Sequence, residues 1–469
     1  MTNDLLARIA ATVGPSGLVP DEPGIAPYLI EQSGLFHGRA LAVVRPASTT
    51  EVAAVVALCA EAGVAIIPQG GNTGLCGGAS PDESGRQILL NLSRHNRIRA
   101  LDPVNYTMTV DSGVVLQTVQ EKADDADCLF PLTFGAEGSA QIGGVISTNA
   151  GGAGVLHYGN TRDLVMGLEV VMPDGRIWDG LRVLRKNNTG YDLRHLFIGA
   201  EGTLGIVTGA VLKLFPKPRD VATAFVALPG LDAALTLLSR ARAAPGDQVT
   251  TFELVPRIGL EFAARHARGA SDPFDASHDW YALIELSTAR GDGTLRDSLE
   301  SLLESALEEG LVADAAIATS VDQARALWRI REGIPEAQKC EGGSIKHDVS
   351  VPTSSIPAFI RRASRAVAEA MPGIRPVPFG HVGDGNIHFN LSQPVGADKE
   401  AYLREWGRMN RIVHDIVVEM NGSISAEHGI GKLKRAEMAH YKEPLELELM
   451  RRIKDAFDPR GLMNPGKVL

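Results

Sequence analysis

Short apolar runs separated by polar or glycine-rich segments characterise the first part of the chain. The runs "LAVVRP" (41–46) and "VAIIP" (64–68) flank "EVAAVVALCAEAG", whose apolar residues recur at the spacing of one helix face. Thr49 and Thr50 come directly before that segment, and their hydroxyls are suited to cap a helix. The pattern therefore predicts a strand, a helix and a second strand, which is the start of an α/β unit.

After the second strand the chain enters a glycine-rich segment, "QGGNTGLCGG", instead of a helix. The segment contains no lysine, which excludes a Walker loop, and no GxGxxG opens a helix, which excludes the nicotinamide fingerprint. A second glycine-rich segment, "GSAQIGGVISTNAGGAG", begins at Gly138. With 50 glycines in 469 residues, we expect backbone to approach a ligand closely and to offer N–H donors to its phosphates.

The pattern changes near Pro216 and Pro218, which are suited to a domain boundary because proline continues neither a helix nor an interior strand. Before this point, residues 164–178 predict two strands that turn at 173–175. After about Val221, strands and helices alternate with fewer glycines. Two βαβ units predict a ferredoxin-like antiparallel sheet covered by helices on one face.

Composition and charge exclude several functions. The formal net charge of −10 argues against a nucleic-acid-binding protein, since phosphate binding requires clustered lysine and arginine. The four cysteines contain no CxxC pair, so neither a disulfide framework nor a thiolate metal site is indicated. No apolar stretch is long enough to span a bilayer. We expect a cytoplasmic protein and leave peripheral association with the inner membrane open.

Two histidines lie close together in "GHVGDGNIHFN". His381 and His388 are separated by an odd number of residues, so on one uninterrupted strand they would face opposite sides. The break at 383–385 allows a turn or bulge that aims His381 toward the side of His388. His388 and Asn390 then share one face, and the apolar residues that alternate with them share the other.

Two cations are candidates for binding an anionic substrate. Arg331 lies on the apolar face of a predicted helix, "VDQARALWRIREG", and a buried unpaired guanidinium is costly, so we expect an anionic partner. Lys346 lies in "SIKHDVSVP", which predicts a strand. Either cation could instead pair with Asp348 or Glu332.

Six motifs occur together and in order: "PQGGNTGLCGGASP", "GSAQIGGVISTNAGGAGVLHYGNTRDLVMGLEVVMPDG", "GAEGTLGIVT", "GHVGDGNIHFN", "SAEHGIGK" and "LMNPGK". This set resembles the FAD-linked D-2-hydroxyacid dehydrogenases of the vanillyl-alcohol-oxidase fold, over nearly the whole chain. The resemblance implies an α+β protein with a PCMH-type FAD-binding domain of two subdomains at 1–219. It also implies a ferredoxin-like substrate domain at 220–449, and a segment at 450–469 that returns to the FAD domain.

FAD is the cofactor that the resemblance implies, and we expect it to be non-covalent because the first glycine loop contains no histidine. The residues implied to bind FAD lie in the first glycine motif, in the second glycine segment and the residues that lead to it, in the third motif and near the C-terminus. They are Pro68, Gln69, Gly70, Gly71, Asn72, Thr73, Gly74, Leu75, Pro131, Leu132, Gly138, Ser139, Ile142, Gly143, Gly144, Asn149, Gly151, Gly152, Glu201, Gly202, Gly205, Ile206, Val207 and Asn464.

The resemblance also assigns the residues around the histidines. His381, His388 and Glu427 match positions that bind a divalent metal, and two imidazoles with a carboxylate suit zinc, with iron, manganese or cobalt as alternatives. His428 matches the general base that accepts the hydroxyl proton. Since His428 adjoins Glu427, we expect the two side chains to serve different roles.

The implied reaction is oxidation of a D-2-hydroxy acid to the 2-oxo acid, with hydride transfer to flavin N5. Arg331, Lys346 and Asn390 match substrate-binding positions, and two cations favour the dicarboxylate D-2-hydroxyglutarate over D-lactate or glycolate. Pro335 stands where the resembled family has a threonine, which puts one substrate hydrogen bond in doubt. The alternatives are a D-lactate dehydrogenase, a glycolate oxidase flavin subunit, or an electron-transfer subunit without a substrate of its own.

The partners that this reaction requires are the 2-hydroxy acid and an electron acceptor. A quinone, an electron-transferring flavoprotein and a cytochrome all remain open as the acceptor, because the sequence contains no second redox centre. A homodimer is also left open.

Overall fold

The computed structural model describes residues 2–31, 33–243 and 248–469. The chain divides into two compact units. The first unit comprises Met1–Gly152, Gly159–Lys217 and Glu427–Leu469, and the second comprises Ala153–Tyr158 and Pro218–Ala426. The division after Lys217 lies beside the expected boundary at 219. The return to the first unit begins at Glu427, whereas we expected it at 450, because the residues that follow His428 are bonded to Cys76 and Glu201 of that unit.

A four-stranded sheet with the order β1-β2-β4-β3 begins the first unit, and β2, β4 and β3 run parallel. The helix between β2 and β3 is capped by Ser48, whose side chain accepts from the N–H of Glu51, and not by Thr49 or Thr50, which lie in its first turn. These elements are α1 (Thr2–Val13), β1 (Leu18–Val19), α2 (Glu22–Leu29), β2 (Ala42–Val44), α3 (Thr49–Ala62), β3 (Ile66–Gln69) and β4 (Ile88–Asn91).

A five-stranded antiparallel sheet with the order β5-β6-β10-β8-β9 completes the first unit, and it contains the predicted β8-β9 hairpin. The elements are β5 (Ile98–Asp102), β6 (Thr107–Asp111), α4 (Leu116–Asp125), α5 (Ile142–Thr148), α7 (Thr161–Leu164), β8 (Val165–Val171), β9 (Ile177–Gly180), α8 (Arg194–Phe197) and β10 (Ile206–Lys213), with a small ladder of β7 (Cys128–Leu129) and β11 (Phe215–Pro216). One parallel and one antiparallel subdomain match the expected α+β architecture.

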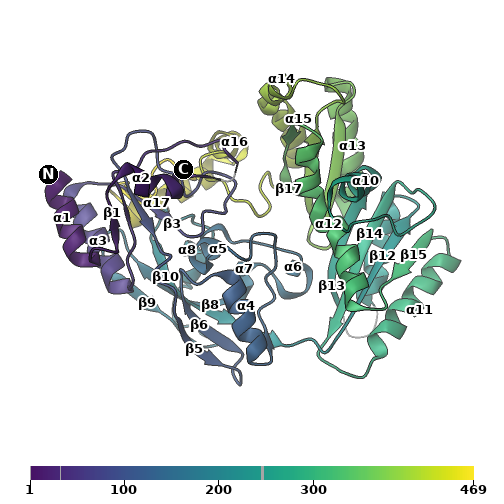
Figure 1. Cartoon of the computed structure of the whole chain (residues 1–469), viewed down its shortest axis with the longest axis horizontal. Coiled ribbons are helices and arrows are strands. Elements are labelled where there is room, and N and C mark those ends of the chain that lie inside the picture. The colour runs from purple at the N-terminus through teal and green to yellow at the C-terminus, as the bar shows by residue number, and fades with distance from the viewer. Residues whose placement is uncertain (1, 32, 244–247) are drawn as a thin grey trace. The chain divides into compact units, whose positions relative to one another are not determined.

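The C-terminal segment packs into the first unit. It contains α16 (Arg435–Tyr441) and α17 (Pro444–Phe457), which Figure 1 shows in yellow among the purple and blue elements. The N–H of Ile66 donates to the carbonyl of Leu462 at 2.9 Å, and the N–H of Asn464 donates back to Ile66 at 2.8 Å. The last residues of the chain therefore extend the parallel sheet at β3.

The second unit contains an eight-stranded sheet whose first four strands follow the order β15-β12-β14-β13, which is the ferredoxin-like order. The hairpin β18-β19 extends this sheet, and β16 and β17 both pair with β19. The strands are β12 (Asp220–Leu228), β13 (Val249–Pro256), β14 (Trp280–Thr288), β15 (Asp314–Ile317), β16 (Ser344–Ile345), β17 (Asp348–Ser350), β18 (Arg375–His381) and β19 (Asn386–Ser392).

Helices cover both faces of this sheet, which corrects the expectation that they cover one. One face packs on α10 and α12 through a core that includes Phe225, Tyr281 and Ile334, while α9 and α11 contact β12, β13 and β14. The reason is that every residue of β13 is buried, so neither side of that strand is available to solvent. The helices are α6 (Val155–Tyr158), α9 (Leu231–Ala243), α10 (Arg257–His266), α11 (Thr294–Glu308), α12 (Val321–Cys340), α13 (Ile356–Ala370), α14 (Lys399–Arg404) and α15 (Trp406–Glu419), with 3-10 turns at Thr353–Ser355 and Val382–Asp384.

None of the helices in the described residues is both long and apolar enough to cross a membrane.

Candidate active site

The first glycine loop, residues 70–78, leaves the end of β3 and packs on the second glycine segment, residues 138–152. A Cβ on Gly71 would lie 1.9 Å from the carbonyl oxygen of Ser139, so glycine is required there for the two backbones to touch. By contrast, a Cβ on Gly74 or Gly144 would meet no protein atom within 4 Å. The glycines therefore serve two purposes: some permit protein packing, and others, such as Gly74 and Gly144, border a surface that no side chain of the described residues covers.

Three buried polar atoms beside these segments have no hydrogen-bond partner among the described residues: Ser112 Oγ, Gln141 Oε1 and Asn464 Oδ1. Gln141 lies beside the first loop, because a Cβ on Gly70 would stand 3.5 Å from its Oε1. Buried polar atoms without partners are costly, and a bound ligand with its own donors would satisfy them. These atoms and the open glycine surface fit a large polar cofactor such as FAD.

Lys467 adds a buried cation near this surface. It is 4% exposed and forms no ion pair within the described part of the chain, although the charges of Asp82 and Glu201 act on it. Burial lowers the pKa of Lys467 to about 8, and the charge of Lys432 acts in the same direction. We did not predict a role for Lys467 from the sequence, although the first glycine loop lacks a lysine of its own to meet an anionic group.

Glu201 connects the glycine region to the residues that follow His428. Its carboxylate accepts the N–H groups of Ile430 and Gly431 at 2.7 and 2.8 Å, and its carbonyl oxygen accepts Nδ2 of Asn464 at 2.7 Å. Burial raises the pKa of Glu201, and the two N–H bonds oppose that shift. The predicted contact of Glu201 with FAD stays a prediction; within the protein, its carboxylate holds the backbone beside the predicted base.

Cys76 makes the second connection. Its carbonyl oxygen accepts the N–H groups of Lys432 and Leu433, at 2.8 and 3.1 Å, and its Sγ lies 3.5 Å from the carbonyl oxygen of Gly429. The first glycine loop and the segment after His428 therefore belong to one body, and this contact fixes the position of the predicted base within the first unit.

Several predicted cofactor residues are used by the protein itself. Gln69 donates to the carbonyl of Tyr28, Asn149 adopts a left-handed conformation (φ 51°) at the end of α5, and a Cβ on Gly202 would lie 2.4 Å from Pro68. The others lie on the first loop, in the second glycine segment and the residues leading to it, or where β10 begins: Gly70, Gly71, Asn72, Thr73, Gly74, Leu75, Pro131, Leu132, Gly138, Ser139, Ile142, Gly143, Gly144, Gly151, Gly152, Gly205, Ile206 and Val207.

In the second unit, β18 and β19 form a hairpin whose connection contains the break at 383–385. Phe379 pairs with His388 in this hairpin, and the rings of His381 and His388 lie 5.6 Å apart, edge to face. The break therefore brings the two histidines to one side, as the sequence predicted. Ile387 and Phe389 are fully buried on the other side and anchor the strand.

Arg331 is 8% exposed, and its Nε donates to Glu253 Oε2 at 2.5 Å. Its guanidinium carbon lies 4.7 Å from the ring centroid of Phe379. The other oxygen of Glu253 bonds to Nδ1 of His381. Burial alone would raise the pKa of Glu253, but the charge of Arg331 and the hydrogen bonds from His381 and Arg331 outweigh it and hold that pKa at about 2. The anionic partner expected for Arg331 is thus a residue of the protein.

Lys346 lies between β16 and β17, which both pair with β19. The register Ser344 to Ser392 and Asp348 to His388 places Lys346 beside Asn390, on the face of His388. No ion pair or hydrogen bond within the described residues reaches its ammonium group, and burial lowers the pKa of Lys346, with Lys339 adding to the shift. Within the described residues, Lys346 is therefore a half-buried cation that forms no ion pair, and the charge of Glu336 only partly offsets the lowering of its pKa.

Asn390 is 4% exposed, and its Nδ2 donates to Gln338 Oε1 at 2.9 Å. Gln338 lies on the same helix as Arg331, α12, and donates in turn to Ser392. Pro335 lies inside this helix, so it offers no N–H to the carbonyl of Arg331 one turn earlier.

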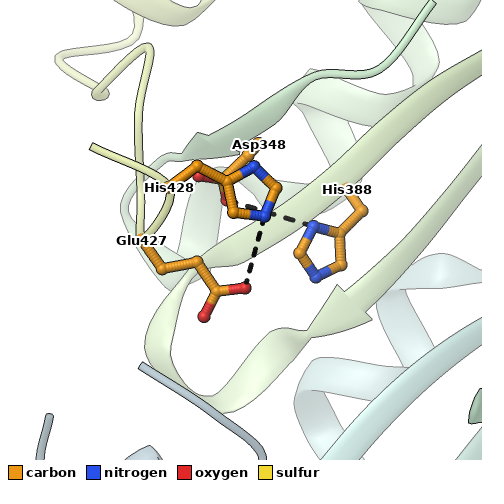
Figure 2. A group of neighbouring side chains, drawn as sticks. All are labelled: Asp348, His388, Glu427 and His428. Atoms are coloured by element: carbon orange, nitrogen blue, oxygen red, sulfur yellow. Dashed lines mark ion pairs between the residues drawn. The ribbon is translucent and has the colours of Figure 1, made fainter. Parts of the chain in front are cut away.

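Four potential metal ligands converge near the end of β17. Figure 2 shows Asp348, His388, Glu427 and His428, each of which offers one ligand atom, and these atoms all lie within 4.8 Å of one another. His388 Nδ1 is 3.9 Å from Asp348 Oδ1, and His428 Nε2 is 3.9 Å from Glu427 Oε1. Two imidazoles and two carboxylates are a donor set that suits a divalent ion such as zinc.

This group differs from the predicted triad in two respects. His381 is outside it, with its Nδ1 bonded to Glu253, and Asp348 takes part instead. Glu427 and His428 converge although we expected them to separate, because the chain is irregular there. The N–H of Ala426 donates to the carbonyl of Asp348 at 3.2 Å, which holds the segment beside β17.

Comparisons with known proteins identify the family. Residues 217–468 match the family model of FAD linked oxidases, C-terminal domain, and residues 40–180 match the model of an FAD binding domain. The chain is 36% identical to the probable mitochondrial D-2-hydroxyglutarate dehydrogenase of Oryza sativa subsp. indica, over 100% of the chain and 82% of the rice protein.

The chain is also 35% identical to the D-2-hydroxyglutarate dehydrogenase of Stutzerimonas stutzeri, over 99% of the chain and 98% of that protein. The crystal structure of p-cresol methylhydroxylase with substrate bound superposes with a TM-score of 0.76 at 16% identity, covering 99% of the chain and 96% of that protein. This similarity confirms the PCMH-type fold. The chain belongs to the FAD-linked oxidase family that includes the D-2-hydroxyglutarate dehydrogenases, and it is an FAD-dependent oxidoreductase.

Proposed function

We propose that the protein oxidises D-2-hydroxyglutarate to 2-oxoglutarate. The observation that carries this proposal is the half-buried cation Lys346 on the same strand pair as His388, with the predicted base His428 close to that histidine. A 2-hydroxy dicarboxylate brings one carboxylate that a cation can bind and a hydroxyl whose proton must leave. The names of the relatives support the same substrate.

Each residue has a defined task in this reaction. Lys346 binds a substrate carboxylate, and Asn390, held by Gln338, borders the same face. His428 accepts the hydroxyl proton at an imidazole nitrogen, and Glu201 keeps the backbone that follows His428 in place. Bound FAD supplies the acceptor for the two electrons that leave the substrate carbon.

Arg331 has a more limited role than the sequence suggested. Its charge is neutralised by Glu253, so it contributes donors of fixed orientation rather than an unpaired positive charge. Among the candidate cations, Lys346 is the one that gains an anionic partner when substrate binds.

The substrate assignment can be tested by steady-state oxidation with an artificial electron acceptor and identification of the product. D-2-hydroxyglutarate should give the highest kcat/KM in a panel that also contains D-lactate, glycolate and L-2-hydroxyglutarate. A higher value for D-lactate or glycolate would replace the proposed substrate. No oxidation of any acid by the FAD-loaded protein would favour an electron-transfer subunit.

We further propose that Asp348, His388 and Glu427 hold a divalent metal that binds substrate oxygens, with His428 beside it as the base. Exhaustive chelation should lower activity, and added zinc, manganese or cobalt should restore it. Glu427→Gln should lower the metal content measured by elemental analysis, because an amide is a poorer ligand than a carboxylate. Full activity of the native protein with no metal left would contradict this role.

We propose that FAD is held without a covalent bond. Acid precipitation of the yellow protein should release all of the flavin into the supernatant, because the first glycine loop contains no histidine to attach it. Absorbance of supernatant and pellet measures the two fractions. Flavin that stays with the pellet after washing would show a covalent link.

The electron acceptor and the location of the protein are also proposals. A quinone, an electron-transferring flavoprotein or a cytochrome would reoxidise the flavin, with the protein in the cytoplasm or at the inner membrane surface. A relative from Saccharomyces cerevisiae is named D-2-hydroxyglutarate--pyruvate transhydrogenase, so pyruvate belongs in the acceptor panel. The acceptor that supports the fastest reoxidation of reduced protein would identify the class.

A further inference from the structure

One carboxylate, Glu253 on β13, connects two residues that the sequence assigned to different tasks. Its Oε2 accepts Nε of Arg331 at 2.5 Å, and its Oε1 bonds to Nδ1 of His381. The strand register places Glu253 directly opposite His381. Glu253 is 1% exposed, so this double contact excludes solvent.

The contact fixes the tautomer of His381. An ionised carboxylate only accepts hydrogen bonds, so Nδ1 of His381 must carry the hydrogen that Glu253 receives. In the neutral ring, Nε2 then carries the lone pair. A histidine that binds metal or substrate oxygens is commonly oriented in this way by a carboxylate behind it.

The same carboxylate restricts Arg331. Its Nε is engaged by Glu253 and its guanidinium plane lies against Phe379, at 4.7 Å from the ring centroid. The hydrogen bond to Glu253 and the stacking on Phe379 fix the orientation of the guanidinium. Its terminal N–H groups are therefore held in one direction. Losing Glu253 would leave this charge buried and free to rotate.

We propose that Glu253 is a positioning residue of the active site, which orients His381 and Arg331 together toward the bound substrate. This inference rests on the proposed function, because it assumes that these two side chains face the substrate. The alternative is a buried ion pair that contributes to folding alone. A positioning role predicts that a folded variant without the Glu253 carboxylate binds the ligand more weakly. A role in folding alone predicts that such a variant binds the ligand with native affinity.

Glu253→Gln keeps the size of the side chain but replaces one acceptor oxygen with a donor. A matched control is Glu285→Gln on the neighbouring strand β14. Glu285 accepts from Trp328 of the same helix, α12, at 2.8 Å and from Thr223 at 3.0 Å, so these hydrogen bonds go to residues other than the partners of Glu253. For the FAD-loaded proteins, we would measure the dissociation constant of 2-oxoglutarate from flavin absorbance, KM and kcat for D-2-hydroxyglutarate, and the unfolding temperature.

Glu253→Gln should weaken 2-oxoglutarate binding and raise KM by about 10–100-fold, the usual range for loss of an orienting carboxylate. Glu285→Gln should change these values by less than about threefold, because the amide oxygen can still accept from Trp328 and Thr223. Equal ligand affinity in the two folded variants would overturn the inference. If Glu253→Gln does not fold, Glu253→Asp can replace it, because the shorter side chain keeps the charge but moves it away from Arg331 and His381. Its ligand affinity is then compared with that of Glu285→Gln.

The tautomer provides a readout that is independent of catalysis. In ¹⁵N-histidine-labelled native protein, the His381 ring, assigned from the signal missing in His381→Gln, should show hydrogen on Nδ1. Hydrogen on Nε2 would overturn the inference even if the protein oxidises D-2-hydroxyglutarate. If instead the native protein neither binds nor oxidises the acid but shows the Nδ1 hydrogen, the proposed function fails while the orientation by Glu253 stands.

Discussion

His428→Asn should reduce the rate of flavin reduction by D-2-hydroxyglutarate by about 10²- to 10⁴-fold, the usual contribution of a positioned general base. Asparagine keeps a polar side chain of similar reach but cannot accept the hydroxyl proton as the substrate is oxidised. FAD content should remain at the native level, because the contacts of Glu201 and Cys76 to the following residues are made by backbone groups. Rapid mixing under anaerobic conditions measures the rate.

His440→Asn is the matched control, since His440 is an exposed histidine of α16 in the first unit. In His440→Asn, D-2-hydroxyglutarate should reduce the flavin at the native rate. If the flavin of His428→Asn is also reduced at the native rate, the base is another residue. Metal content should be measured for both variants, because His428 lies within the group of potential ligands and its replacement could also weaken metal binding.

Lys346→Met should weaken transition-state binding of D-2-hydroxyglutarate by about 2–5 kcal/mol, as for a buried charge pair that loses one partner. The loss should appear in kcat/KM with little change in stability, because no described residue forms an ion pair with Lys346. Arg331→Met should differ, since it leaves Glu253 without its cation and should destabilise the fold by about 3–5 kcal/mol. Kinetics and thermal unfolding of both variants measure these effects.

The pH dependence of kcat/KM tests whether the positive charge of Lys346 is needed. Burial lowers the pKa of this amine, so the ammonium loses its proton at lower pH than an exposed lysine does, and kcat/KM should fall as pH rises through that value. Lys346→Arg keeps the charge at all accessible pH, and the alkaline fall should move upward or disappear. If Lys346 binds the second carboxylate of D-2-hydroxyglutarate, which D-lactate lacks, Lys346→Met should lose more activity with D-2-hydroxyglutarate than with D-lactate. Equal losses for the two acids would contradict that role.

Local patterns were sufficient to predict much of this molecule. The two βαβ units predicted the ferredoxin-like strand order, and the break at 383–385 predicted that His381 and His388 share a side. The position of Arg331 on an apolar helix face predicted its burial and an anionic partner. Each of these follows from the period of a helix or strand, or from the cost of an unpaired buried charge, and both are properties of short segments.

The residues that the sequence did not reveal depend on contacts between distant segments. Glu253 is an acid within an apolar strand, and nothing in "TTFELVP" indicates that Arg331 and His381 meet it. Asp348 joins His388 through strand pairing, and the irregular chain around Glu427 follows no period from which side-chain directions can be inferred. The second covered face of the sheet was missed because which face α10 and α12 pack on depends on contacts between distant segments, which no local period shows.

The central claim is that this FAD-dependent protein oxidises D-2-hydroxyglutarate, and anaerobic reduction of its flavin tests that claim most directly. Mixing with excess D-2-hydroxyglutarate should bleach the flavin absorbance completely in a single turnover and release one 2-oxoglutarate per flavin, whereas L-2-hydroxyglutarate should leave the spectrum unchanged. A flavin that stays oxidised with the D-acid but bleaches with D-lactate or glycolate would contradict the account.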